Sequence, residues 1–387
     1  MKTRERLQFP FVSNYPDYQV NSISLMSTPE RVGALTEYTG RGIQIAFIDS
    51  GFSNHADLIG RIHLHVDAST ENILEQPRVI TYTGMSWHGQ MTSVIAAGDG
   101  KLSNGQFRGI ASEAELILIK VSTPHFQIKE RDILRGLKWV YDSRDRHNIR
   151  VVNVSVGGDR VSSDPSHHLH DIVKKLTEVG IVVVVAAGNS GSDRLLPPAS
   201  APDAIVIGGY DDHNSTNQDQ WTLYRHNHGH VYNGTTKPDL IAPANWIISP
   251  LLPKSETEAE IHNLAQLLTA QTEDDVLAII ADGQEALNLT DEEIEHVDEV
   301  LYDKLQNRIY HHKVVDGNHQ YVDGTSVAAP IVTSIIAQML QVKPDLTPNQ
   351  VRQILMDTAQ SVDRYAPTLQ GAGLIQAGKA VQAVLNM

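Results

Sequence analysis

Short runs of β-branched and apolar residues recur along this chain, and they alternate with segments that have a helical period. The apolar runs cover residues 42–51, 115–121, 149–156, 180–189 and 204–209. Runs of this kind, bounded by glycine or polar residues, are typical of parallel strands that are buried on both faces. Residues 131–142 and 167–180, between the runs, have the pattern of helices. The alternation predicts an α/β fold with a mostly parallel sheet flanked by helices, which gathers ligands at the carboxyl ends of its strands.

An acidic segment interrupts this alternation. Residues 251–305 hold 15 Asp and Glu against two Lys, a net charge of −13, whereas the whole chain carries −15. Each of three hydroxyl residues is followed three positions later by an acid, the spacing of a helix-capping box; the pairs are Ser255 with Glu258, Thr272 with Asp275, and Thr290 with Glu293. We therefore predict three short helices without strands. In this interpretation residues 251–318 are an acidic helical insertion between residues 31–250 and 319–387.

Composition excludes several classes of protein. The charge of −15 argues against nucleic acid as a partner, because phosphate binding needs a basic surface. Cysteine is absent, so disulfides and thiol chemistry are excluded. No run of 18 apolar residues predicts a membrane span, and the first residues lack the apolar region of a secretion signal. Together these features predict a cytoplasmic protein without a membrane partner.

Three polar side chains stand where apolar elements end or begin. Asp49 ends an apolar strand, His88 opens an apolar helix, and Ser326 opens another. Separately they read as a turn residue, a surface histidine and a helix cap. Together they have the residue types of a nucleophilic site, because a serine hydroxyl needs an imidazole base and the imidazole needs a carboxylate to fix its tautomer. The chain order Asp, His, Ser is the one found in subtilisin, and the G-x-S-x-G pattern of other hydrolases is missing around Ser326.

Six sequence blocks resemble the successive signature blocks of subtilisin-like serine proteases, in the order of that family. They are IAFIDSGFSNHADL, HGQMTSVIAAG, VVNVSVGG, VVVVAAGNSG, KPDLIAP and DGTSVAAPIVTSIIA, and the similarity runs from about Gly42 to Ala359 without the acidic segment. The resemblance implies that residues 31–250 and 319–387 form a subtilisin-like catalytic domain. It also implies that Ser326 attacks the scissile carbonyl, that His88 acts as general base and then acid, and that Asp49 orients His88.

The resemblance also assigns the groups that hold the substrate. Asn189 matches the side-chain amide of the oxyanion hole, although Asn-Ser-Gly is also ordinary turn chemistry. Residues 155–157 match the strand that pairs with an extended substrate and walls the primary pocket, unless they are an ordinary sheet edge. The substrate-binding residues expected on this basis are Ser155, Val156, Gly157, Ala187 and Gly188.

The chain departs from the family at positions beside the expected site. After His88 the family reads Gly-Thr-His, whereas this chain has Gly89, Gln90 and Met91, and Ile331 stands where a histidine is common. The opposing substrate strand, at residues 122–127, contains Pro124, which cannot donate a backbone hydrogen bond. We therefore expect altered packing beside the site and a weakened or redirected pairing with substrate.

Two segments suggest regulation. Residues 1–30 form an N-terminal extension that resembles the inhibitory segment of intracellular subtilisins, with Leu7, Pro10 and Phe11 as the matching residues. The alternative is a surface strand that only packs on the domain. Residues 251–318 are a candidate lid or recruitment module for partners or substrates, and the alternative is a solvated insertion that aids solubility.

No cofactor is expected for the chemistry and no metal is assigned to the site. His226, His228 and His230 have strand-face spacing in a polar segment without Cys, which disfavours zinc. Structural calcium is implied only by the resemblance, with the loop at residues 98–110 as its location. We expect a serine endopeptidase that hydrolyses protein or peptide substrates through an acyl-enzyme. The alternatives are a protease-derived binding module with little turnover, and a transpeptidase or cyclase that processes peptides.

Overall fold

The computed structural model describes residues 25–76, 85–123, 125–253, 255 and 257–387. Two compact units are present. The larger comprises Met26–Ile247 and Asp323–Met387, and the smaller, Ile248–Val322, interrupts it in the sequence. Most of the predicted N-terminal extension, including Leu7, Pro10 and Phe11, lies outside the described residues, and so does Pro124.

The larger unit is built on a nine-stranded sheet in the order β11-β7-β6-β5-β1-β4-β2-β3, with β8 paired to β7. Its strands are β1 Gln44–Asp49, β2 Ile62–Asp67, β3 Leu74–Gln76, β4 Glu115–Lys120, β5 Ile149–Val154, β6 Val182–Ala186, β7 Ile205–Asp211, β8 Thr222–Leu223 and β11 Leu240–Pro243. All of these pairings are parallel except β2–β3 and β7–β8. The predicted α/β fold is confirmed, and the five predicted apolar runs are β1, β4, β5, β6 and β7. Strand order reverses beside β1, which is where ligands bind in sheets of this kind.

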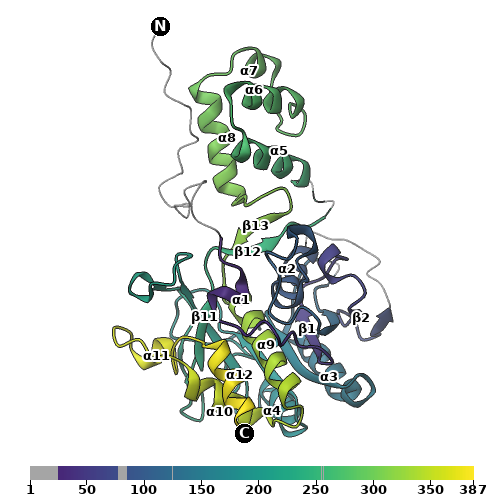
Figure 1. The fold of residues 1–387 in the computed structure, drawn as a ribbon. Helices are drawn as coiled ribbons and strands as arrows, with labels where there is room; N and C mark the ends of the chain where they lie inside the picture. The colour runs from purple at the N-terminus through teal and green to yellow at the C-terminus, as the bar shows by residue number, and fades with distance from the viewer. Residues whose placement is uncertain (1–24, 77–84, 124, 254, 256) are drawn as a thin grey trace. The chain divides into compact units, whose positions relative to one another are not determined.

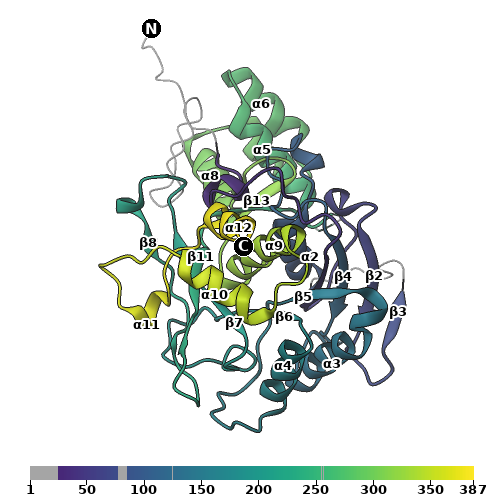
Figure 2. The ribbon, with the colours of Figure 1, turned by 60° about the horizontal axis from the view of Figure 1, so that its bottom comes forward.

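Helices cover both faces of this sheet (Figures 1 and 2). On one face lie α2 Ser86–Ala97, α9 Thr325–Val342, α10 Pro348–Thr358 and α12 Ala377–Leu385, and on the other lie α3 Glu130–His147 and α4 His168–Glu178. The amphipathic pattern of α3 and α4 places Leu137 and Val173 against Ile48 and Val154 of the sheet, all fully buried. The remaining short elements of the unit are α1 Thr28–Arg31, α11 Pro367–Gln370, β9 Gly229–His230 and β10 Thr236–Lys237.

Helix α9 is apolar on all sides because it is a core helix of this unit. Its length and hydropathy would suffice for a membrane span, but 89% of that stretch is buried inside the fold. It packs on β5, β6, β7 and β11 and on helices α2 and α12. The first residues of α9 therefore have little freedom to move, which matters for Ser326.

The N-terminal edge of the larger unit is fixed by a buried ion pair. Arg31, in α1, places its Nη1 2.6 Å from Oδ1 of Asp212, and both side chains are almost completely inaccessible. Asn214 Oδ1 accepts the backbone N–H of Met26 at 2.9 Å. Burial is the main reason that the pKa of Asp212 is raised, although the charge of Arg31 opposes it.

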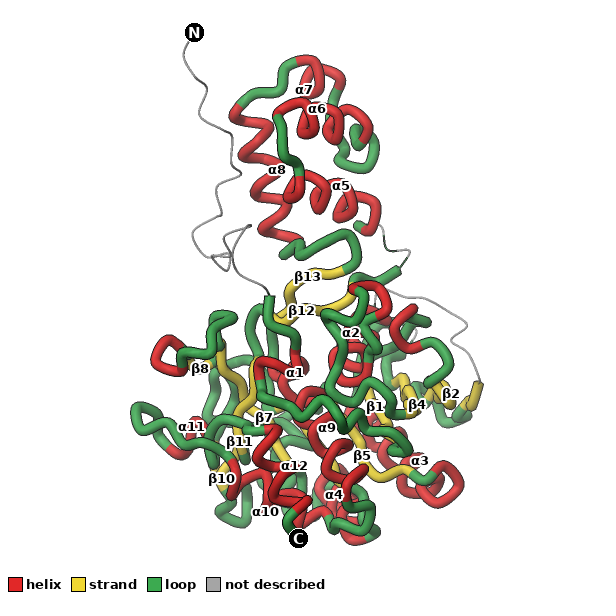
Figure 3. The backbone as a smooth tube through the Cα atoms, viewed as in Figure 1, coloured by secondary structure: helices red, strands yellow, loops and turns green. Residues whose placement is uncertain are grey.

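The smaller unit consists of four helices and a two-stranded ribbon (Figure 3). Its elements are β12 Ile247–Pro250, α5 Glu258–Thr269, α6 Glu273–Asp282, α7 Asp291–Glu295, α8 Glu299–His312 and β13 His319–Val322. The helices share their own apolar core, in which Leu264, Leu287 and Leu305 are fully buried. Because this core contains only residues of the smaller unit, the segment can bury its apolar surface without help.

The predicted helices of this segment need two corrections. Thr272 and Thr290 form the expected capping boxes, but Ser255 does not, because α5 begins after Thr257, which makes no side-chain cap. The predicted third helix is two helices, since Asp298 accepts the N–H of Leu301 and caps a new helix, α8. Thr290 and Asp298 both lie along one apolar stripe, and each caps a helix of its own. In the larger unit, Thr347 caps α10, with Gln350 completing the box.

Candidate active site

Asp49 is the last residue of β1, and its carboxylate is completely buried. Oδ1 accepts the Ser50 N–H at 2.6 Å and lies 2.6 Å from Nδ1 of His88. Oδ2 accepts the hydroxyl of Thr92 at 3.2 Å. A buried carboxylate is tolerated when such partners compensate for its lost hydration. Asp49 is therefore held in one orientation, with one oxygen directed at the imidazole.

His88 lies in the first turn of α2 and presents its ring to a pocket. Burial by itself lowers the pKa of His88, but the negative charge of Asp49 and the hydrogen bond to it outweigh burial, so this pKa is raised above its ordinary value of 6.5. Because Nδ1 faces a carboxylate, the neutral ring carries its proton there and leaves Nε2 as the base. A base of this kind accepts a proton from a hydroxyl that faces Nε2.

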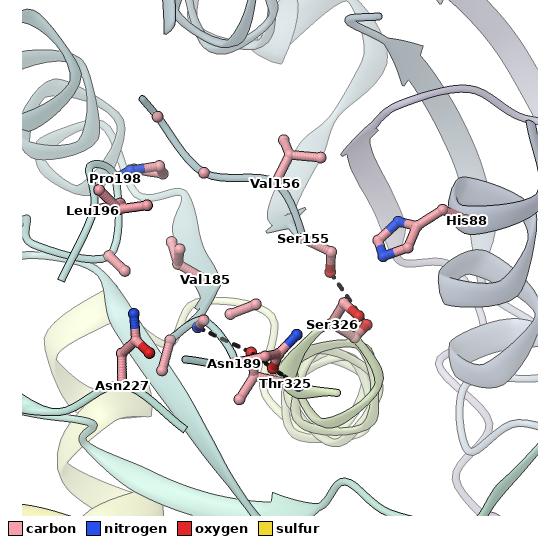
Figure 4. Close-up of a pocket in the computed structure, with 16 residues that line it drawn as sticks. His88, Ser155, Val156, Val185, Asn189, Leu196, Pro198, Asn227, Thr325 and Ser326 are labelled. Atoms are coloured by element: carbon pink, nitrogen blue, oxygen red, sulfur yellow. Dashed lines mark hydrogen bonds between the residues drawn. The ribbon is translucent and has the colours of Figure 1, made fainter. Parts of the chain in front are cut away.

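Ser326 is the second residue of α9 and not its cap. The N-cap is Gly324, whose φ of 138° belongs to glycine, and a Cβ at this position would lie 3.0 Å from Ser326 Oγ. Figure 4 shows the Ser326 hydroxyl and the His88 ring facing the same open space, and no hydrogen bond joins these two described side chains. Catalytic hydrogen bonds of this type commonly tighten only when substrate binds.

Two N–H donors border Ser326. Among the described residues, the backbone N–H of Ser326 has no hydrogen-bond partner, as expected in the first turn of a helix. The side-chain oxygen of Asn189 accepts the Thr325 N–H at 2.8 Å and the Thr325 hydroxyl at 3.0 Å. These bonds fix the amide orientation and leave Nδ2 of Asn189 as a donor, 3.3 Å from the position of a Cβ at Gly324. The two donors and the positive end of the α9 dipole can stabilise an oxyanion.

The pocket beside these groups has a volume of about 260 Å³. Each residue predicted to bind substrate contributes to its lining, as do the predicted nucleophile, base and amide; these are Ser155, Val156, Gly157, Ala187, Gly188, Ser326, His88 and Asn189. Val185, Leu196, Pro198 and Ala199 supply further apolar surface. The structure thus brings these predicted residues to one pocket at the carboxyl ends of β5 and β6, and Asp49 reaches it only through His88.

A buried polar chain links the backbone of Ser326 to the middle of α9. The Thr333 hydroxyl donates to Oδ1 of Asn153 at 3.1 Å, and Nδ2 of Asn153 donates to the Ser155 hydroxyl at 2.9 Å. The Ser155 hydroxyl in turn donates to the Ser326 carbonyl at 3.3 Å (Figure 4). Sequence analysis did not find Asn153 or Thr333, because each is an ordinary polar residue within an apolar run. The hydrogen bond between them joins residues that are 180 positions apart in the sequence.

The departures from the family are accommodated inside the fold. Gln90, Met91 and Ile331 are all buried, so they alter packing and not the accessible surface. Ser122 and Ile128 form an antiparallel bridge, and the Thr123 N–H donates to the Gln127 carbonyl at 2.8 Å. That backbone donor is therefore used within the loop.

The described residues give no metal site at either location considered. His226 is buried, with Nδ1 accepting the Gly209 N–H at 3.0 Å and Nε2 donating to the Leu369 carbonyl at 2.6 Å, so neither nitrogen is available to zinc. In the loop at residues 98–110, Asp99 accepts the Lys101 N–H. Within the described part of the chain no three acid or histidine side chains converge.

Comparison with known proteins agrees with the fold. Residues 40–373 match the subtilase family. The chain is 29% identical over 353 residues to serine protease AprX of Bacillus subtilis (strain 168), covering 89% of this chain and 67% of that protein. It is 26% identical over 253 residues to the major intracellular serine protease of the same organism, covering 62% and 71%. Fervidolysin from Fervidobacterium pennivorans, a keratinolytic enzyme related to subtilisin, has a similar fold, with a TM-score of 0.61, 20% identity and coverage of 91% and 45%.

The family match and these relatives identify the protein as a subtilisin-like serine endopeptidase. The chain belongs to the subtilase family.

Proposed function

We propose that Asp49, His88 and Ser326 act as a catalytic triad that hydrolyses peptide bonds through an acyl-enzyme. The observation that carries this proposal is the 2.6 Å hydrogen bond between buried Asp49 and His88, at a pocket that Ser326 also lines. A carboxylate fixed in this way directs the basic nitrogen of the ring toward the hydroxyl.

The reaction follows from these positions in two halves. His88 takes the Ser326 proton as the hydroxyl attacks the scissile carbonyl, and the resulting oxyanion receives hydrogen bonds from Asn189 Nδ2 and the Ser326 N–H. His88 then donates the proton to the leaving amine, which departs and leaves the acyl-enzyme. Water repeats the sequence, with His88 again as base, and releases the acid product. No metal or cofactor takes part in these steps.

Substrates are proposed to be extended segments of proteins or peptides. The Ser155–Gly157 segment follows β5 and lines the pocket, so it can pair with a substrate backbone by main-chain hydrogen bonds. On the opposite side, where the resemblance places a second substrate strand, the Thr123 N–H already donates to the Gln127 carbonyl and is not offered to a substrate. We therefore expect affinity to depend strongly on the side chain in the pocket.

The proposal is tested with purified protein and a denatured, fluorescently labelled protein substrate. The wild type should release peptides, and Ser326→Ala should reduce the rate by at least about 10⁴-fold while retaining the same thermal unfolding midpoint. A Ser326→Ala variant with wild-type activity would overturn the assignment of the nucleophile.

Product analysis separates the remaining alternatives. A binding module would retain peptides without cleaving them. A transpeptidase or cyclase would yield products that lack the added water, which mass spectrometry detects as an 18-dalton difference. Products that all carry the added water support hydrolysis.

Residues 251–318 are proposed to recruit substrates or partners. The basis is their net negative charge together with a core of their own. Basic segments of unfolded proteins are the partners that this charge favours.

Two further proposals rest on the sequence alone. Inhibition by the N-terminal segment predicts that deleting residues 1–20 raises the activity of freshly made protein, and an unchanged rate would count against it. The proposed cytoplasmic location is tested by fractionating cells that express the protein at its natural level.

A further inference from the structure

The primary pocket is neutral apart from His88. Its lining contains no Asp, Glu, Lys or Arg, and most of its wall is aliphatic, glycine or backbone. One polar side chain, Asn227, lies on the side of this pocket away from His88 (Figure 4). Only 6% of Asn227 is exposed, so its amide is a buried polar group at the wall of an apolar cavity.

Hydrogen bonds fix the amide of Asn227 in one orientation. Its Oδ1 accepts the Ser190 N–H at 2.8 Å and the Ser190 hydroxyl at 2.7 Å. Since only the oxygen can accept from a backbone N–H, Nδ2 must point the other way. The Asn227 N–H also donates to the Gly188 carbonyl at 2.9 Å, which holds the residue against the pocket wall.

The donor end of this amide is directed into the pocket. Nδ2 would lie 2.8 Å from a Cβ at Gly188, which also lines the pocket. Figure 4 shows the nitrogen of Asn227 toward the space that Val185 and Leu196 border. Among the described residues no hydrogen bond is made by Nδ2, and this nitrogen is not one of the side-chain atoms closed off from solvent, so it is open to water in the pocket. A ligand that covers this donor without accepting from it removes the hydrogen bond that water supplies, which costs binding free energy.

We propose that Asn227 determines specificity by donating a hydrogen bond from Nδ2 to a neutral carbonyl oxygen at the end of the substrate side chain, that of Asn or Gln. The side chain meant is that of P1, the residue whose carbonyl is attacked. The inference rests on the proposed function, because it takes this pocket as the site of P1.

The chemistry of the wall selects among P1 side chains. Leucine has nearly the shape of asparagine but would leave the buried donor unpaired. A carboxylate would accept the hydrogen bond but would lose its hydration in a neutral pocket. A lysine ammonium would face the Nδ2 donor of Asn227, which cannot accept a hydrogen bond, and the pocket has no acidic side chain to balance its charge. Neutral amides are the side chains that fill the pocket and satisfy its donor.

The test uses peptides that differ only at P1, with Asn, Gln, Leu, Glu and Lys. For the wild type, kcat/KM for the better of the two amides should exceed that for Leu by about tenfold, and should exceed those for Glu and Lys by more. A higher value for Leu than for both amides would overturn the proposal.

Asn227→Asp provides the matched variant. One carboxylate oxygen can still accept both Ser190 donors, and the other replaces the amide donor with an anionic acceptor. The preference should then change to Lys, with the Lys-to-Gln ratio of kcat/KM rising at least about tenfold. If this variant unfolds, Asn227→Ala serves instead, and its preference for the amides over Leu should disappear. Ratios unchanged from wild type in a folded variant would contradict the inference.

Labelling of Ser326 by a fluorophosphonate distinguishes failure of this inference from failure of the proposed function. Wild-type protein that cleaves every peptide without regard to P1 contradicts the role of Asn227 alone. Protein that cleaves none of them, and whose Ser326 does not react with a fluorophosphonate, contradicts both proposals.

Discussion

At the residue scale, hydrogen bonds hold the polar side chains of the candidate site in one orientation and leave one atom of each side chain available for its proposed role. Asp49 is held by Ser50 and Thr92, so that it can hold His88. Asn189 is held through its oxygen, so that its nitrogen is free to donate. The residue types and their order could be predicted from the sequence. The residues that hold Asp49 and Asn189 in place could not be predicted. Hydroxyls and amides able to do so occur throughout the chain, and only the fold decides which of them lie within hydrogen-bond distance.

Replacing Asp49 should change both the rate and its pH dependence. In the proposed mechanism His88 must be neutral to act as a base, so wild-type activity should fall as pH drops through its raised pKa. Asp49→Asn removes the charge that raises this pKa, so the acid limb of the kcat/KM profile should move to lower pH. At a pH above this limb, kcat should fall by about 10⁴-fold, because the asparagine no longer holds the imidazole in the tautomer that leaves Nε2 as the base. An acid limb that does not move would show that Asp49 does not set the pKa of His88.

Asn189 should contribute mainly to turnover. Asn189→Ala removes one of the two proposed oxyanion donors, and kcat should fall by about 10²–10³-fold with little change in KM, the size of loss that removing a side-chain oxyanion donor causes in subtilisin. Steady-state kinetics on a single peptide measures both constants. A rise in KM with kcat unchanged would assign Asn189 to ground-state binding instead.

Thr333 provides a test of the buried polar chain. Thr333→Val keeps the shape but removes the donor to Asn153, so Ser326 should be held less exactly and kcat should fall by a few-fold to about tenfold. Thr333→Ser keeps the hydroxyl and should retain the wild-type kcat. If both variants lose kcat and thermal stability to the same extent, Thr333 has only a packing role.

At the element scale, the first turns of helices hold both the proposed catalytic residues and the capping residues from which helix starts are predicted. Helix α9 could be predicted because its apolar run follows Gly324, Thr325 and Ser326. The break between α7 and α8 could not, because Thr290 and Asp298 are equally good caps along one apolar stripe. The choice depends on how Leu301 and Leu305 reach the core of the smaller unit.

The capping box of α6 should stabilise the smaller unit measurably. Thr272→Ala removes the acceptor for the Asp275 N–H and should lower the free energy of unfolding by about 1 kcal/mol. Thr272→Ser keeps the acceptor and is the control. Urea unfolding followed by circular dichroism gives both values, and equal stabilities for the two variants would contradict the role of the cap.

At the scale of the whole molecule, a second hydrophobic core interrupts the sequence of the catalytic fold. The charge pattern predicted this segment, and the structure adds that β12 and β13 flank its helices. Asn227 shows the limit of sequence analysis at this scale. It lies in a polar stretch considered only for zinc, and its partner Ser190 is 37 residues away.

The smaller unit can be removed at its narrowest point. The Leu251 N–H donates to the Asn318 carbonyl at 2.8 Å, so residues 252–317 can be replaced by Asn-Gly, a two-residue turn suited to joining two strands. We expect kcat/KM on short peptides to stay within about twofold and cleavage of denatured, basic proteins to fall at least about fivefold. Equal activity on every substrate would exclude recruitment by this unit.

Covalent modification of the wild-type protein by a fluorophosphonate, mapped by peptide mass spectrometry, tests the triad most directly. The account predicts one adduct, on Ser326, that forms at least about 10³-fold more slowly in His88→Ala and not at all in Ser326→Ala. An adduct on another residue, or equal rates for the wild type and His88→Ala, would contradict it.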